Sequence, residues 1–432
     1  MRERTSSVAL AISIVSGAVA ALGCSSASGG SEPAGVARSN LARNENPDVT
    51  GANQAALEDG NASFAFDFFG QVRAGTGNVV FSPCSLSSAL AMSYAGARGN
   101  TATELASALH FALPQDSLHP AFDWLDLQLA SRAHAAQGGG SAFELRVASS
   151  AWVRSKASIE PAYLDTLAVN YGAGVELTDF TNLEASRQAV NDWASAATDG
   201  RIVGLVPAGG VDPNTVFMLV NAIAFDAHWA QPFQARDTAN GAFVRFDGST
   251  AQASMMSQTA TFPYASGDGY QAIELAYEGS QVAMDVFLPA AGTAPAFEAG
   301  LTASQFASIV SGLQPMSVFL SLPKVRLPGA SVELASAFEH LGARDAFIRG
   351  TADFSGITGN LDLFIARIFH QAFLAVDENG TQAAAATAVV FDDASVALNQ
   401  TAMNVNRAFF FAIRDVPTKT ILFMGRIADP TL

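Results

Sequence analysis

Apolar and polar positions follow two periods along residues 52–432. Apolar residues three and four apart predict helices, and alternation at every second residue predicts strands. We expect helices over 55–72, 85–97, 101–109, 121–136, 160–171, 183–198, 302–313 and 334–341. We expect strands over 143–153, 174–177, 216–225, 243–246, 255–264, 271–276, 282–288 and 316–323, and within 364–376, 403–413 and 420–428.

The order of these elements predicts an α+β fold. Several strands follow one another directly, and helices do not alternate with strands as they do around a parallel sheet. Hydrophobic residues make up 49% of the chain and 30 residues are Phe, which indicates one large core. No linker or internal repeat interrupts 52–432, so we expect a single globular domain there.

The segment 371–395 has the least ordinary pattern. An apolar strand-type run, 373–376, is broken by Asp377-Glu378-Asn379-Gly380, and 381–391 then carries no charge and no glycine. Its alanines favour a helix, but its threonine, valine and phenylalanine residues favour a strand. One face of such a strand would consist of Thr381, Ala383, Ala385, Thr387, Val389 and Phe391. Small side chains at its start displace little packing, which is typical of a loop that becomes a strand in another state.

The N-terminus predicts export. Arg2 and Arg4 precede an uncharged, mostly apolar run, 8–22, which is too short for a comfortable membrane span. Leu22-Gly23-Cys24 resembles a bacterial lipoprotein cleavage box, with Cys24 lipidated, although Ala21 departs from that pattern. Ordinary cleavage after 18–20 is the alternative. We therefore expect a signal peptide over 1–24 and, from its small and polar composition, a flexible tether over 25–51.

The charge of the chain limits its possible binding partners, and its cysteine content limits its possible disulfides. The net charge of −16 leaves no basic face for nucleic acid. The two cysteines are Cys24 and Cys84, so lipidation of Cys24 would exclude an intramolecular disulfide. Cys84 lies in an apolar helix start and is expected to be a buried small hydrophobe.

Enzyme signatures are absent from the sequence. It contains no G-x-S-x-G, H-E-x-x-H, phosphate loop or G-x-G-x-x-G, and its six histidines are scattered. None of the histidines has a second ligand at metal-site spacing. We expect no catalytic activity, metal or cofactor.

The segment 378–391 resembles the hinge and reactive-centre loop of the serpins, a family of serine protease inhibitors. Further pieces resemble the family in its own order: 78–86, 215–233, 321–324, 408–411 and 423–426. The resemblance covers 52–432. It implies one domain with three β-sheets, about nine helices and an exposed reactive-centre loop, so that Thr381 starts at the surface. The hinge would comprise Glu378, Gly380, Thr381, Ala383, Ala384, Ala385 and Ala386.

The resemblance also implies two polar sites in the central sheet. Ser82, Ser85, Asn221 and His370 match a buried cluster that we call the shutter. Trp229 and Lys324 match the upper opening of the sheet, which we call the breach, where Lys324 would pair with Glu378. From the residues alone, His370 could equally be an ordinary core histidine and the Lys324–Glu378 pair an ordinary surface ion pair.

The function implied is irreversible suicide-substrate inhibition of a serine protease, as a monomer and through a covalent acyl complex. Counted from Glu378, the reactive bond is Ala394-Ser395; counting back from 408–409 gives about Ala397, and Leu398 is a further alternative. Alanine suits elastase-like or subtilisin-like enzymes, and no Lys or Arg lies between Gln371 and Asn406 for a trypsin-like one.

The rival interpretation is a non-inhibitory serpin that acts as a carrier, chaperone or surface scaffold. Such members tend to carry charged, bulky or proline residues in the hinge, and this hinge has none. The protein would be a lipoprotein of the outer membrane or cell surface, in contact with the membrane only through its lipid, or else be secreted.

Overall fold

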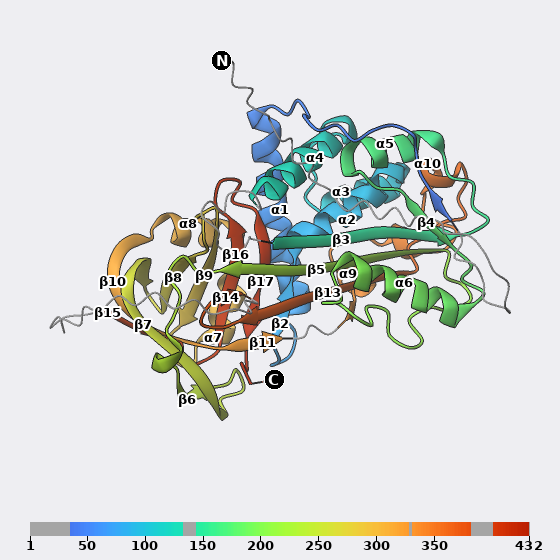
Figure 1. Ribbon diagram of the computed structural model, residues 1–432. Helices are drawn as coiled ribbons and strands as arrows, with labels where there is room; N and C mark the ends of the chain where they lie inside the picture. Colours follow the sequence, from blue (N-terminus) through green and yellow to red (C-terminus); the bar gives the residue numbers. More distant parts are fainter. Residues whose placement is uncertain (1–34, 133–143, 328–330, 382–400, 432) are drawn as a thin grey trace, which may run out of the picture. The chain divides into compact units, whose positions relative to one another are not determined.

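The computed structural model describes residues 35–132, 144–327, 331–381 and 401–431, all within one compact unit, Pro33–Leu432. These residues form ten α-helices, two short 3-10 helices and seventeen strands. The helices are α1 Gly51–Val72, α2 Pro83–Gly96, α3 Gly99–Ala108, α4 Gln115–Arg132, α5 Pro161–Tyr171, α6 Leu183–Ala197, α7 Ala294–Gly300, α8 Ala303–Ser311, α9 Ala335–His340 and α10 Ser355–Thr358. The mixed α+β architecture is confirmed (Figure 1).

The first sheet has the order β1-β4-β3-β5-β14-β13-β11, with β12 also on β13. Its strands are β1 Val36–Ala37, β3 Glu144–Arg154, β4 Val175–Thr178, β5 Phe217–His228, β11 Val325–Leu327, β12 Val332–Glu333, β13 Arg367–Val376 and β14 Gly380–Thr381. The central strand β5 is antiparallel to β3 and parallel to β13. Because side chains alternate, Phe217, Leu219 and Ile223 of β5 enter the main core, whereas Met218, Val220 and Ala222 pack under α6.

The second sheet has the order β15-β10-β7-β8-β9-β16-β17-β2, with β6 on β7. Its strands are β2 Val79–Phe81, β6 Ala239–Val244, β7 Thr250–Gly267, β8 Tyr270–Ala276, β9 Val282–Pro289, β10 Gln314–Pro323, β15 Thr401–Asn404, β16 Phe409–Asp415 and β17 Ile421–Ile427. The long β7 pairs first with β6, then with β10, and at its end with β8. Two of the three expected sheets are thus joined into one through β7.

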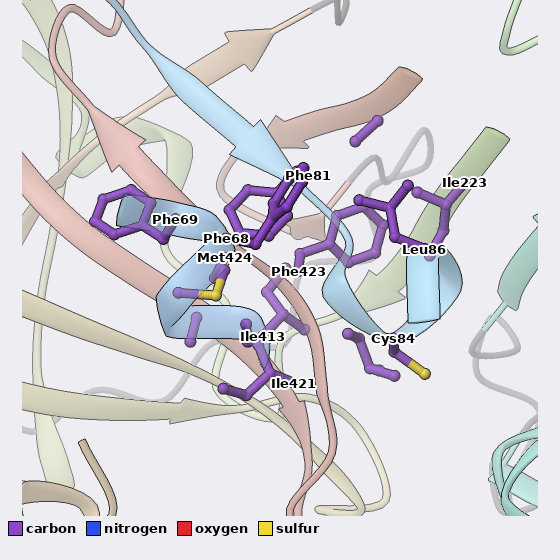
Figure 2. Packing of buried hydrophobic residues seen from close by; sticks show 14 of the residues in the cluster. Phe68, Phe69, Phe81, Cys84, Leu86, Ile223, Ile413, Ile421, Phe423 and Met424 are labelled. Carbon is purple, nitrogen blue, oxygen red and sulfur yellow. The ribbon is translucent and has the colours of Figure 1, made fainter. Parts of the chain in front are cut away.

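Helix α2 lies in the middle of the core. The Ser82 side chain accepts a hydrogen bond from Ser85 N–H and Pro83 occupies the first turn, so both favour a helix start here. Figure 2 shows side chains of α1, α2, β5, β16 and β17 meeting in one apolar cluster. Cys84 lies in it as a free, buried thiol, and burial raises its pKa to about 12, so it stays protonated.

Some elements differ from their prediction. Helix α4 begins at Gln115 rather than 121 and includes Pro120, which forfeits one early hydrogen bond without ending the helix. The two-residue strands β1 and β14 were not predicted, because a short strand has no period to detect. Within the described ranges, no helix is both long enough and apolar enough to cross a membrane.

The tether predicted over 25–51 is wrong for its described part, residues 35–50, which we call the N-terminal strap. Its strand β1 pairs antiparallel with β4, and Ser39 Oγ donates to Asp165 Oδ1 at 2.5 Å. Arg43 forms ion pairs with Asp123 and Asp126 at 2.7 and 2.6 Å, and the Asp123 side chain is fully buried. Composition suggested a tether because the segment has too few apolar residues to form a core of its own. The strap is held instead by backbone pairing and by Arg43, the counter-ion of the buried carboxylate of Asp123.

Candidate functional site: the hinge and the strand pair below it

The hinge begins inside the first sheet. Gly380 and Thr381 form β14 and pair antiparallel with His228 and Ala227 of β5, while Thr381 also pairs with Val376 of β13. A side chain at position 380 would put its Cβ 2.0 Å from the Ala227 carbonyl oxygen, so only glycine fits this approach.

The expectation that Thr381 starts at the surface is wrong. Its side chain is fully buried, and its Oγ1 lies 2.6 Å from the Tyr277 hydroxyl. A small side chain with one hydroxyl can be buried here because this partner satisfies it. Burial raises the pKa of Tyr277, so its phenol stays protonated at any physiological pH.

Trp229 packs against the same point, as its assignment to the breach implied. Its ring stacks on Tyr277 with centroids 4.5 Å apart. Its backbone N–H donates to the Asn379 carbonyl at 2.8 Å, and its indole N–H donates to the Asp377 carbonyl at 3.0 Å. The turn that leads into the hinge is therefore held through two of its carbonyls by the backbone and the indole of one residue, Trp229.

Lys324 and Glu378 are brought together. Lys324 Nζ lies 2.7 Å from Glu378 Oε2, and Thr238 Oγ1 donates to Glu378 Oε1 at 2.8 Å. Burial alone would raise the pKa of Glu378, but the hydrogen bonds from Lys324 and Thr238 outweigh it and lower that pKa. Because Lys324 is 40% exposed, the pair contributes little to stability and mainly positions the base of the hinge.

The four shutter residues also meet, at the junction of β5, β13 and α2. His370 and Asn221 are directly paired across the parallel β5–β13 ladder, with His370 Nδ1 2.7 Å from Asn221 Oδ1. Ser85 Oγ donates to the same oxygen at 2.8 Å, and Ser82 N–H donates to His370 Nε2 at 3.2 Å. Asn221 Nδ2 donates to the Ser85 carbonyl and, at 2.7 Å, to Ser149 Oγ, so every hydrogen-bonding position of this amide is used.

These contacts define the protonation state of the His370 ring. Nε2 accepts from a backbone N–H, so Nδ1 must carry the proton that is donated to Asn221. Burial lowers the pKa of His370 to about 3, with the hydrogen bond to Asn221 opposing the shift. A second proton would place two donors face to face at Nε2. The neutral ring is therefore part of a structural cluster that spans two strands.

Sequence reasoning missed three partners: Ser149, Tyr277 and Thr238. Ser149 is a polar residue within a mainly apolar strand, which could have marked it, but neither Tyr277 nor Thr238 stands out in its local sequence. Of the predicted residues, Ala383, Ala384, Ala385, Ala386, Ala394, Ser395 and Cys24 lie outside the described residues. In the parts of the chain described, no three or more His, Cys, Asp or Glu residues group as metal ligands would.

The His370 geometry predicts acid sensitivity. The unfolded chain binds a proton at this histidine below about pH 6.5, while the folded chain does not do so until about pH 3, so lowering the pH favours unfolding. We expect the free energy of unfolding to fall more steeply in wild type than in His370→Gln, by up to about 1.4 kcal/mol per pH unit below 6.5. Urea unfolding of both proteins from pH 7 to 4 measures this.

Buried His119 provides a comparison, since burial lowers its pKa to about 4. His119→Gln should flatten the same curve on its own, and the double variant should flatten it further. Parallel curves for wild type and His370→Gln would contradict the neutral, buried state of His370.

Comparison with known proteins shows which family has this architecture. The family model described as Serpin (serine protease inhibitor) matches residues 59–430. An uncharacterised serpin-like protein of Thermococcus kodakarensis is 37% identical over 85% of this chain and 84% of its own length. Leukocyte elastase inhibitor A of Mus musculus is 33% identical over 87% of this chain and 99% of its own.

A solved structure agrees in fold. Human thyroxine-binding globulin, in its complex with thyroxine, has a TM-score of 0.78 and 27% identity over 88% of this chain and 100% of that one. The relatives thus include a protein named as an inhibitor and another crystallised with a small ligand. With a family model that covers most of the length and relatives above 30% identity, the chain belongs to the serpin family.

Proposed function

We propose that this serpin is an irreversible suicide-substrate inhibitor of serine proteases. The observation that carries the proposal is β14: Gly380 and Thr381 already pair with β5, Thr381 also pairs with β13, and beyond them β5 and β13 pair directly with each other from Arg367↔Met218 to Phe373↔Ala224. An extra strand can therefore continue from β14 along the sheet if a single pair of strands, β5 and β13, separates.

The register of β14 indicates what would follow. If the antiparallel ladder that begins at Thr381↔Ala227 continued, Thr387 would pair with Asn221 and Phe391 with Phe217. Residues of odd number would face the main core, as Phe217, Leu219 and Ile223 of β5 do. The alanines at 383 and 385 would be placed where strand separation must begin, and the threonine at 387 would bring a hydroxyl to the shutter.

The same register supports Ala394-Ser395 as the reactive bond. Residue 394 would stand three positions beyond Phe391 and so just past the start of β5, at the end of the sheet away from the hinge. Ala397 and Leu398 would lie farther beyond the end of β5. The additional residues between the last strand pair and the reactive bond would then make the connection to the protease longer and looser. A short connection holds an attached protease more closely against the sheet.

The chemistry requires no group of this chain beyond the bond itself. The protease serine attacks the carbonyl carbon of Ala394, the bond to the Ser395 nitrogen breaks, and an acyl-enzyme ester forms. The freed segment then enters the sheet as a new strand. The path along β5 from His228 to Phe217 spans roughly 36 Å. The trapped product persists if insertion is faster than hydrolysis of the ester.

The target class follows from the residue before the cut. Alanine fits a shallow specificity pocket, which favours elastase-like or subtilisin-like proteases. The similarity to a relative named as an elastase inhibitor supports this class. We propose that the protein is exported as a monomer that needs no cofactor. It would be anchored to the outer membrane or cell surface through lipidated Cys24, with ordinary secretion after cleavage near 18–20 as the alternative.

A second candidate function is non-inhibitory carriage of a small molecule. It is favoured by the similarity to the thyroxine complex and by a surface cavity of about 580 Å³ between α1 and residues 298–304. That volume is within the range of ligand pockets. The cavity is lined by charged side chains that include Asp67 and Arg73, whereas carriers of apolar ligands need a mainly apolar lining.

The direct test is incubation with elastase-like and subtilisin-like serine proteases. We expect an adduct that survives boiling in detergent, and mass spectrometry should find a released C-terminal peptide that begins at Ser395. A peptide that begins at Asn399 would replace the reactive bond by Leu398-Asn399. Cleavage of the loop without any adduct, across the whole panel, would favour the carrier.

The hinge offers a second test, with Thr381→Arg compared with Thr381→Ser. Arginine must lose its hydration at a fully buried position, so it should expel β14 and slow insertion, and the ratio of adduct to cleaved product should fall at least about tenfold. The serine variant keeps the hydroxyl that meets Tyr277 and should retain the wild-type ratio. Gel densitometry measures both, and an arginine variant that behaves like wild type would refute insertion at this position.

A further inference from the structure

The N-terminal strap determines where the chain leaves the folded body. The Gly35 carbonyl accepts a hydrogen bond from Leu177 N–H of β4, and Leu177 pairs with Val153 of β3. Val153 in turn pairs with Phe217, the first residue of β5. The hinge pairs with the last residue, His228. Gly35 and the hinge are therefore at opposite ends of the same sheet, as β4 and β14 show in Figure 1.

The strap is held along most of its length. After β1, Ser39 bonds to Asp165 of α5, Arg43 to Asp123 and Asp126 of α4, and Asn44 N–H to the Val169 carbonyl at 2.9 Å. Asp123 is fully buried and Arg43 supplies its counter-charge, so detaching the strap would leave a buried carboxylate without one. Any anchor upstream therefore acts on the body at Gly35, not at the start of α1.

Only ten residues, 25–34, separate Cys24 from Gly35. Fully extended they would span at most roughly 36 Å. A protease domain of about 220 residues has a radius of gyration of about 17 Å, hence a diameter of about 45 Å.

We propose that the membrane surface is a steric partner of this inhibitor. The inference rests on the proposed function, in both its lipid anchor and its strand insertion. An anchored molecule presents its hinge end away from the lipid, where a protease has free access. Insertion then carries the protease to the end of the sheet at which the short leader emerges. Even a fully extended leader is shorter than the protease is wide, so the body must tilt before the protease fits between sheet and lipid, and leader length sets how many encounters end in capture.

The experiment compares leader lengths on vesicles of phosphatidylethanolamine and phosphatidylglycerol. Full-length lipidated protein, a variant with twenty Gly/Ser residues inserted between Glu32 and Pro33, and a deletion of 27–31 are each mixed with a soluble elastase-like protease. We expect the ratio of adduct to cleaved product to rise at least about twofold on insertion and to fall on deletion, because the maximum reach of the leader changes accordingly. The strap and the rest of the described residues are unchanged in all three.

Cys24→Ser versions of the three proteins are the matched controls. Without the lipid, all three should give one common ratio, since no surface competes for space. Equal ratios on vesicles would overturn the steric role of the membrane while leaving inhibition intact. Failure of the lipidated protein to float with vesicles would overturn the anchor. Loop cleavage without adduct in the Cys24→Ser controls would overturn the proposed inhibition itself, and the inference with it.

Discussion

The hydrogen bond between His370 and Asn221 is the contact on which the rest of the sheet depends. It crosses the parallel ladder between β5 and β13, which joins the strands on either side of it into one sheet. A strand placed between them would move these residues from neighbouring strands to strands about 9.6 Å apart, twice the ordinary spacing. The bond can form only while β5 and β13 are neighbours, so the shutter would oppose the insertion of a strand between them.

Insertion of a strand would also increase the stability of the sheet. A new strand that continues β14 would replace one parallel ladder by two antiparallel ones, which are slightly more stable per residue, and would pair backbone groups that a loop leaves to water. Asn221 would exchange its imidazole partner for the hydroxyl at 387. Breaking the bond between His370 and Asn221 before that hydroxyl arrived would leave buried polar groups unpaired, and this interval would be a barrier to insertion.

The resemblance to the serpins predicted much of this site by assigning Asn221 and His370 to one buried cluster. From the residues alone they are polar positions in otherwise apolar strands, and Glu378-Asn379-Gly380 is a visible break after a strand. The burial of Thr381 was not predictable, since it depends on Tyr277, more than a hundred positions away, and on the depth to which Gly380 approaches β5. The strap was missed for a related reason: Arg43 has meaning only beside the buried carboxylate of Asp123, and composition cannot see that pairing.

The central claim is that the sheet has room for one more strand and gains stability by accepting it. Calorimetry of the protein before and after a single cut in the loop between 387 and 398 tests this most directly. About ten further ladder residues at about 1 kcal/mol each should raise the melting temperature by about 10 °C or more in a domain of this size. An unchanged or lower melting temperature after the cut would contradict the account, because an ordinary protein is not stabilised by a nick.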